Sequence, residues 1–323
     1  MKSSDCGHVA LSIFIATAML AGCGGSQPPI VGSGSMPQNG TIAMHAGHGG
    51  SWMRPEAKGR DLLYIALGNE VNVYTYPRGG LLGSLGVGGL YLCTDRANNV
   101  FIPAGLFGTQ ILVYAHGAIT PKVTLNDPYA AVDCSVDPTS ETLAVTEGFG
   151  GGIVIFPYSQ KRGWRYAKSY ADPDMQSITF CTYDKNGDLF VDGGGSSGGF
   201  RLAELQKGSK TFTTITLDQT ISAAGSMQWD GKYLAIADLG TGSSSPSVIY
   251  RFALSGSSGT KVSKTTLQLS YARAQFWIQG STVIGPIAYD SVRAFGFWRF
   301  PAGGSPVKSF SDQAPSGEAV SLK

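Results

Sequence analysis

A short apolar segment recurs between residue 61 and the C-terminus, and its spacing constrains the fold of this chain more than any other feature. Each copy is rich in aliphatic residues and follows a turn-forming stretch, as a β-strand after a tight turn does. The copies begin at Leu62, Val100, Leu143, Leu189, Leu234 and Val283, so successive starts are 38, 43, 46, 45 and 49 residues apart. A period in this range indicates one supersecondary unit that is repeated along the chain.

Residues 180–195, FCTYDKNGDLFVDGGG, show the unit most clearly. They predict a strand, a tight turn in which Gly187 takes a positive φ, and a second strand that ends at the glycines 193–195. Elsewhere a Gly-rich loop leads on to a third strand with alternating aromatic residues, such as Val73-Tyr74-Thr75-Tyr76, and to a short fourth strand. Four strands in about 40–50 residues is the pattern of one propeller blade.

We therefore predict an all-β fold, a six-bladed β-propeller of four-stranded blades. Seven blades is the main alternative, but no unassigned segment is long enough to supply another blade. The first copy lacks a first strand, and residues 316–322 are the one candidate for it. The C-terminal strand would thus complete the blade that begins at Asp61 and close the ring, which removes free sheet edges.

Composition agrees with this fold and excludes several function classes. Charged residues make up only 14% of the chain and glycine occupies 45 positions, which favours strands and turns over helices. The net charge is +2 without a basic run, so we expect no nucleic-acid partner. His116 is the sole histidine after residue 58, and no G-x-S-x-G, H-E-x-x-H or phosphate-loop motif is present. Nothing therefore points to a Ser-His-Asp hydrolase, a zinc protease or a P-loop enzyme.

The N-terminus predicts export and membrane anchoring. An apolar run at residues 9–20 is too short to span a bilayer comfortably, and small residues follow it, as in a signal peptide. Leu20-Ala21-Gly22-Cys23 resembles the lipobox of bacterial lipoproteins, which implies cleavage before Cys23 and acylation of its thiol. The predicted domains are a lipoprotein signal peptide (1–23), a flexible Gly/Ser/Pro linker (24–58) and the propeller (59–323). The resemblance implies an extracytoplasmic protein of the bacterial cell envelope, whose partner is the membrane.

The turn pattern also resembles that of a known class of propellers. Residues 184–189 match D-x-x-G-N/D-hydrophobic, while residues 95–100 lack the glycine and residues 137–143 are one residue longer. This pattern is similar to NHL-type six-bladed propellers over residues 61–323. The phrases YAHG, CSVDP, LFVDG and QWDGKYLA further resemble an uncharacterised group of bacterial lipoproteins. The resemblance implies the fold and carries no activity, because propellers serve as enzymes, binders and scaffolds alike.

Acidic residues gather in the loops that one face of a propeller would carry. The loops after the second strands contain Glu147, Asp192 and Asp238, and the loops entering each new first strand contain Asp127, Asp172 and Asp218. Convergent carboxylates bind hard cations such as Ca²⁺ or polyhydroxylated ligands. Each aspartate can instead cap its own turn, which is the commoner role for Asp at strand ends.

Two functions remain. The first is a non-catalytic envelope module that binds a protein or glycan, without a cofactor. The alternative is a Ca²⁺-dependent hydrolase that resembles lactonase propellers, with Glu147, Asp192 and Asp238 as part of its metal site. The residues also leave open whether Cys93, Cys134 and Cys181 include a disulfide; the pair Cys93–Cys134 is the one considered, and no metal spacing is present.

Overall fold

The computed structural model describes residues 50–105, 108–148, 151–166, 168–240, 246–270, 275–289, 292–312 and 315–323. Cys23 and the predicted signal peptide lie outside these residues, as does the linker up to residue 49. No helix in the described ranges has both the length and the apolar character needed to cross a membrane.

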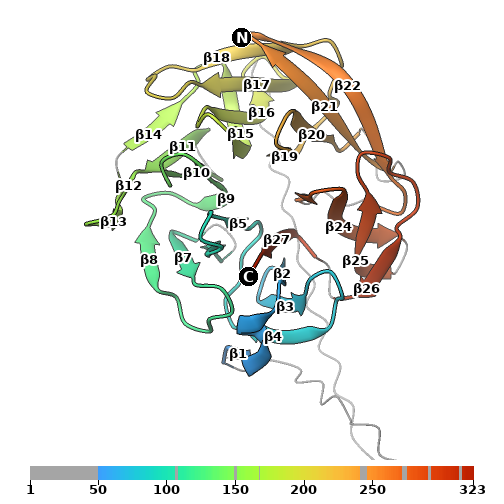
Figure 1. The fold of residues 1–323 in the computed structure, drawn as a ribbon. Helices are drawn as coiled ribbons and strands as arrows, with labels where there is room; N and C mark the ends of the chain where they lie inside the picture. The colour runs from blue at the N-terminus through green and yellow to red at the C-terminus, as the bar shows by residue number, and fades with distance from the viewer. Residues whose placement is uncertain are drawn as a thin grey trace, which may run out of the picture. The chain divides into compact units, whose positions relative to one another are not determined.

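The described strands form six groups of four antiparallel neighbours, arranged around a ring (Figure 1). The outermost strands of the fourth and fifth groups also pair with each other, in parallel, over two residues. From the innermost strand outward, the first group is β27 (Gly317–Ser321), β2 (Leu62–Ala66), β3 (Val71–Thr75) and β4 (Leu81–Leu85). The second is β5 (Cys93–Thr94), β6 (Val100–Ala104), β7 (Gln110–Tyr114) and β8 (Val123–Asn126). The third is β9 (Ala131–Val136), β10 (Leu143–Glu147), β11 (Gly152–Phe156) and β14 (Lys168–Ala171).

The second half of the chain repeats this order. The fourth group is β15 (Met175–Tyr183), β16 (Leu189–Gly195), β17 (Phe200–Leu205) and β18 (Thr213–Leu217). The fifth is β19 (Ala224–Trp229), β20 (Leu234–Asp238), β21 (Ser247–Ser255) and β22 (Ser258–Leu267). The sixth is β23 (Trp277–Gln279), β24 (Thr282–Tyr289), β25 (Val292–Arg299) and β26 (Lys308–Ser311). The predicted all-β propeller is confirmed, and every repeated apolar segment is the second strand of its group.

The C-terminal strand closes the ring as predicted. β27 pairs antiparallel with β2 over the whole length of both strands, from Leu62↔Ser321 to Ala66↔Gly317. The first and last strands of the repeat region therefore belong to one sheet, and the innermost edge of the first group is covered.

A short hairpin, a short strand and a 3₁₀ helix lie outside the repeat. β12 (Tyr158–Ser159) and β13 (Gly163–Trp164) form a small hairpin that carries Trp164 over the third group. β1 (Trp52–Met53) adds a fifth strand outside β4, and the 3₁₀ helix η1 (Pro55–Gly59) follows it. The propeller thus begins within the predicted linker 24–58, because residues 52–58 already pair with and cover the first blade.

One local expectation is wrong. The glycines 193–195 were expected to end the second strand of the fourth blade, but β16 continues through all three. A Cβ on Gly193 would lie 1.9 Å from the carbonyl oxygen of Ser177 on β15. The glycines therefore permit the close approach of two paired backbones, and Asp192 lies inside the strand.

The core lies between neighbouring blades. One buried cluster combines Phe101 and Val113 of the second blade with Leu143 and Phe156 of the third, and Trp164 packs edge-on to Phe101 at 5.2 Å between ring centroids. Because the apolar residues of one sheet are covered by the next sheet, no blade has a complete core of its own.

Polar side chains of the innermost strands connect successive blades around the centre. Each accepts a hydrogen bond from the backbone N–H of the next inner strand: Asp133 from Cys181 (2.9 Å), Ser135 from Tyr183 (3.0 Å), Thr182 from Trp229 (3.2 Å), Ser226 from Phe276 (3.1 Å) and Gln228 from Ile278 (2.6 Å). Gln275, which precedes β23, likewise accepts from the N–H of Glu318 on β27 (3.1 Å), and it also accepts from the N–H of Leu92 in the second blade (3.0 Å). Between the second and third blades the connection is covalent, since Cys93 of β5 and Cys134 of β9 form a disulfide.

Candidate functional site

The predicted acidic residues after the second strands do not converge. Glu147 is the last residue of β10 and accepts a 2.6 Å hydrogen bond from the hydroxyl of Ser169. Asp192 is fully buried inside β16. Asp238 ends β20, and its Oδ1 caps the local loops by accepting from the N–H groups of Ser222, Ala223 and Gly240.

The predicted residues before the first strands also bind their own surroundings. Asp127 Oδ1 accepts from the N–H of Tyr129 (2.9 Å), Asp172 Oδ1 from the N–H of Asp174 (3.0 Å), and Asp218 Oδ1 from the N–H of Lys261 (2.8 Å). Asp127 and Asp172 thus form turns of the kind that Asp commonly makes with a backbone N–H two residues on. Burial raises the pKa of Asp127 to about 6, and the charge of Glu147 adds to this effect.

No metal centre is formed by these side chains. Within the described ranges, no group of three or more His, Cys, Asp or Glu side chains is placed to hold an ion. Each of the six predicted residues is instead capping a loop, bonded to a neighbour or enclosed in a strand.

A second set of buried carboxyl groups consists of Asp133, Asp192 and Glu318, and the sequence analysis identified only Asp192 among them. Asp133 lies on β9, Asp192 on β16 and Glu318 on β27. Burial raises the pKa of Asp133 to about 7 and raises those of Asp192 and Glu318 well above their usual range. Neither Asp192 nor Glu318 has a hydrogen-bond partner of good geometry among the described residues, although the backbone N–H of Phe180 lies near enough to Asp192 to oppose part of the increase in its pKa. Asp192 and Glu318 therefore stay protonated in the folded protein near neutral pH, whereas Asp133 is only about half protonated there.

Tyr91 is within electrostatic reach of two of these acids. Its ring packs on Phe180 at 5.0 Å between centroids, and burial together with the charges of Asp133 and Glu318 raises its pKa to about 12. An acidic residue inside an apolar strand, as in AVDCSV and GEAVS, was the signal that could have identified Asp133 and Glu318.

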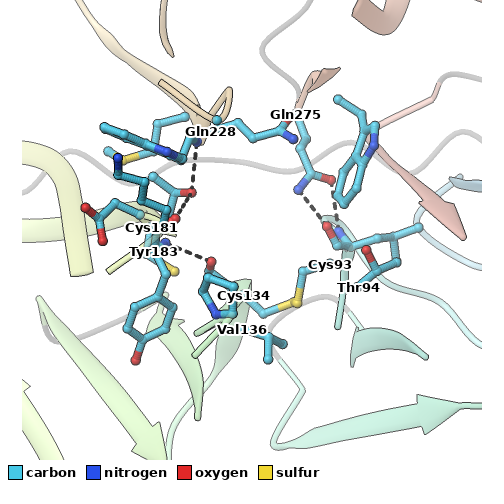
Figure 2. Close-up of a pocket in the computed structure, with 18 of the residues that line it drawn as sticks. Cys93, Thr94, Cys134, Val136, Cys181, Tyr183, Gln228 and Gln275 are labelled. Atoms are coloured by element: carbon cyan, nitrogen blue, oxygen red, sulfur yellow. Dashed lines mark hydrogen bonds between the residues drawn. A yellow bond between two sulfur atoms is a disulfide. The ribbon is translucent and has the colours of Figure 1, made fainter. Parts of the chain in front are cut away.

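A cavity of about 330 Å³ lies at the other end of the inner strands. It is lined where β5, β9, β15 and β19 end, by Thr94, Val136, Tyr183 and Trp229, and by Trp277 of β23. The predicted acidic loops precede these same strands, so the cavity is on the opposite face of the ring from them. Figure 2 shows the labelled lining residues around an open centre, with the Cys93–Cys134 disulfide on one side.

The cavity wall combines polar and apolar surface in about equal parts, and several aromatic residues contribute to it. Leu92, Met227, Phe276 and both tryptophans line it together with the disulfide, and its charged lining residues are Arg96, Asp184 and Lys185. The amides of Gln228 and Gln275, which also line it, are bonded to the backbone of neighbouring inner strands. Burial raises the pKa values of the Cys181 thiol and the Tyr183 phenol well above their usual range, so both remain protonated.

Comparison with known proteins supports the architecture. No family model and no curated protein matches the sequence. Among solved structures, one in a nidogen/laminin complex is 11% identical, with a TM-score of 0.60, and the match covers 81% of this chain and 98% of that one. The chain has the β-propeller fold.

Two further propeller-like structures come from Bacteroides. A protein of unknown function from Bacteroides caccae is 11% identical with a TM-score of 0.59, and the match covers 82% of this chain and all (100%) of that one. A putative 6-phosphogluconolactonase from Bacteroides fragilis is 12% identical with a TM-score of 0.54, covering 82% and 99% of the two chains. At such identity the similarity shows the fold alone.

Proposed function

We propose that this propeller is a non-catalytic binding module, displayed on the bacterial cell envelope by a lipid anchor, and that its ligand occupies the 330 Å³ cavity. The observation that supports this most is the chemistry of the cavity wall. A volume of this size is at the lower end of the range for small-ligand sites. Its lining combines aromatic rings with polar and charged side chains, a combination that suits ligand recognition.

Among the described lining residues, the groups that could act as a nucleophile or a base are protonated or already accept hydrogen bonds. The thiol of Cys181 and the phenol of Tyr183 stay protonated, and Asp184 Oδ1 accepts hydrogen bonds from the N–H groups of Asn186 (2.7 Å) and Asp188 (3.0 Å). A general base needs a free lone pair within reach of a substrate proton. The lining favours binding over catalysis for this reason.

The proposal is tested by filling the cavity. Thr94→Trp places a large ring at a lining position, and Thr213→Trp is the control on the exposed outer strand β18. Binding of envelope polysaccharides and glycans, followed by the fluorescence of Trp229 and Trp277 and by calorimetry, should be lost in Thr94→Trp and retained in the control. If none of these polysaccharides and glycans binds the wild-type protein, the proposal of a binding module in this cavity is refuted.

The lipid anchor is tested separately, by measuring the mass of the mature protein. The resemblance of Leu20-Ala21-Gly22-Cys23 to a lipobox predicts a mature N-terminus at Cys23 that carries acyl chains. Two or more chains would hold the protein firmly, since each buried methylene adds about 0.8 kcal/mol. The mass of the protein purified from membranes checks this, and a mature form without acyl mass would contradict it.

The Ca²⁺-dependent hydrolase remains the alternative, because two of the similar structures are putative 6-phosphogluconolactonases. A bound ion would stabilise the fold by about 2.7 kcal/mol at a hundredfold excess over its dissociation constant. We expect no difference in melting temperature between EDTA and millimolar Ca²⁺. A Ca²⁺-dependent rise that Asp192→Ala abolishes, together with lactone hydrolysis above the spontaneous rate, would favour the enzyme.

A further inference from the structure

The turns that lead out of the inner strands of four blades share one construction. Each begins with an aspartate whose Oδ1 accepts hydrogen bonds from backbone N–H groups two to four residues further on: Asp95 from Asn99, Asp137 from Thr139, Asp184 from Asn186 and Asp188, and Asp230 from Lys232 and Tyr233. Bonds of this kind are typical of Asp at the start of a turn. They fix the path of the backbone at the rim of the cavity.

The residue after each aspartate faces the same cavity. Arg96, Pro138, Lys185 and Gly231 all line it, although they come from four different blades. The aspartate is the same in each turn, while the next residue is a cation, a proline, a cation and a glycine. The fixed turn therefore presents four different side chains at one rim, as a scaffold presents the contacts that determine specificity.

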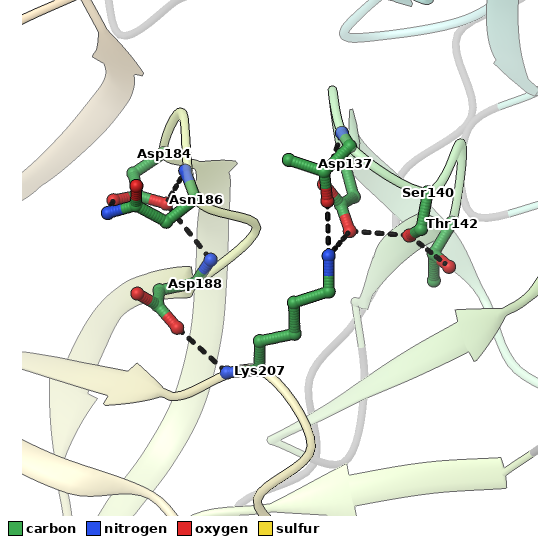
Figure 3. A network of polar contacts seen from close by, with 8 residues as sticks. Asp137, Ser140, Thr142, Asp184, Asn186, Asp188 and Lys207 are labelled. Carbon is green, nitrogen blue, oxygen red and sulfur yellow. Dashed lines mark hydrogen bonds and ion pairs between the residues drawn. The ribbon is translucent and has the colours of Figure 1, made fainter.

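Two of the four aspartates are paired with cations. Asp137 lies 3.5 Å from Lys207 Nζ, which also bonds to Thr139, and Asp230 forms a 2.6 Å ion pair with Arg251. Figure 3 shows Lys207 reaching from the fourth blade to Asp137 of the third, beside Asp184 and Asp188. Burial raises the pKa of Asp137, but hydrogen bonds from Ser140 and Thr139 and the charge of Lys207 outweigh it, so the net pKa is lowered and the group stays ionised.

Neither of the two cations at the rim is paired with a carboxylate of the described residues. Arg96 and Lys185 are exposed, and neither forms an ion pair or a hydrogen bond through its side chain with any described residue. Burial raises the pKa of Glu141 and the charge of Arg96 opposes this increase, so Arg96 already interacts with one carboxyl group. The hydrogen-bonding groups of both cations remain available to an anion at the mouth of the cavity. Guanidinium and ammonium groups form charge-assisted hydrogen bonds with carboxylate, sulfate and phosphate.

The wall that contains these cations also contains aromatic rings. Trp229 stacks on Phe190 with an interplanar angle of 11°, which holds its ring in place, and the Trp277 indole N–H donates to Gln279 at 3.3 Å. Phe276 and the disulfide complete this part of the lining. At about 30 Å³ for each water molecule, the cavity has the room of about ten waters, enough for one or two six-membered rings.

From this arrangement we infer that the cavity recognises an acidic sugar. The apolar C–H face of a sugar ring packs against the tryptophans, and its carboxylate, sulfate or phosphate pairs with Arg96 and Lys185. This inference rests on the proposed binding function and narrows it to one ligand class.

The test is calorimetric titration of the full-length protein with two anionic probes, trigalacturonate and a heparin-derived tetrasaccharide, and two neutral ones, the methyl ester of trigalacturonate and maltotriose. Arg96→Gln and Lys185→Gln should each raise the dissociation constant of the anionic probe about tenfold, the usual size of a charged hydrogen bond. Lys210→Gln is the matched control, because Lys210 is an exposed cation of the fourth blade outside the cavity lining. Raising NaCl from 50 to 500 mM should weaken wild-type binding and affect the double variant less.

Trigalacturonate tests for a carboxylate ligand, and the heparin-derived tetrasaccharide tests for a sulfated one. Equal affinity for trigalacturonate and its methyl ester, or no effect of either substitution, would overturn the inference. If both anionic probes fail to bind while a neutral glycan binds in a way that Thr94→Trp abolishes, the acidic-sugar inference falls and the binding module stands. If nothing binds in the cavity, the proposed function falls as well.

Discussion

Residues with positive φ hold the inner turns of neighbouring blades, and the sequence indicates some of them. Gly187 has φ +88°, as its place in D-K-N-G-D predicts. The turn at residues 95–100 lacks a glycine, and Asn98 takes φ +60° instead; in the longer turn Glu141 takes φ +58°. Asn enters the left-handed region more readily than most residues, so the departures from the motif keep the same backbone role. Glu141 could not have been predicted, because an ordinary side chain there must be held by its surroundings.

Gly187 of the fourth blade also lies against Asp137 of the third blade, and this contact gives a prediction for a single residue. A Cβ there would lie 2.8 Å from both carboxylate oxygens of Asp137. Gly187→Ala should cost about 3 kcal/mol of unfolding free energy in urea, from left-handed strain plus overpacking. Gly208→Ala, with φ +82° and no atom within 4 Å of the added carbon, should cost only about 1 kcal/mol. Equal losses in the two variants would mean that the contact with Asp137 does not matter.

At the scale of strands, the local sequence pattern was enough to predict where the strands lie, but not which residues of neighbouring blades contact each other. The second strands and the closing strand β27 follow from spacing and apolar content. The Cys93–Cys134 disulfide was left open, because spacing does not say which inner strands are adjacent. Asp192 was assigned to a loop, since a triple glycine usually ends a strand; only the close approach of Ser177 on β15 explains why the strand continues.

The closing strand provides the prediction for elements. Deleting residues 317–323 removes the innermost strand of the first blade and exposes the edge of β2, so the melting temperature should fall by more than 10 °C or the chain should not fold. Ser321→Ala is the milder variant, because its hydroxyl donates to the carbonyl oxygen of Asn98 at 2.7 Å and bonds to His116. A loss of about 1–2 kcal/mol is expected. Ser311→Ala, on the exposed outer strand β26, should leave stability unchanged, and a truncated protein as stable as wild type would disprove the closure.

For the molecule as a whole, repetition made the fold predictable and the site unpredictable. The acidic loops are visible in the sequence, but which carboxylates are already bonded depends on side chains that arrive from other turns and blades, as Lys207 does for Asp137. The cavity is lined by residues from five blades, among them Thr94, Pro138, Lys185, Gly231 and Trp277, none of which stands out locally. Its place at the opposite end of the inner strands follows only once the ring is assembled.

The buried acids make the stability of the whole ring depend on pH. Burial raises the folded-state pKa of Asp133 to about 7 and those of Asp192 and Glu318 well above their usual range, whereas in the unfolded chain all three titrate near pH 4. Between these values the unfolded chain has lost protons that the folded protein keeps. Each such group therefore contributes stability that is complete below about pH 4 and declines by about 1.4 kcal/mol for each pH unit as pH rises toward its folded pKa.

The urea unfolding free energy of the wild-type protein should consequently fall from pH 5 to pH 8. Glu318→Gln removes one of these groups without changing its shape, so its curve should be flatter over the three pH units. Glu56→Gln, at an exposed carboxylate in η1, is the control and should follow the wild-type curve. If Glu318→Gln and wild type have the same pH dependence, Glu318 is ionised in the folded protein, and the centre of the ring must then hold a positive charge or water that stabilises it.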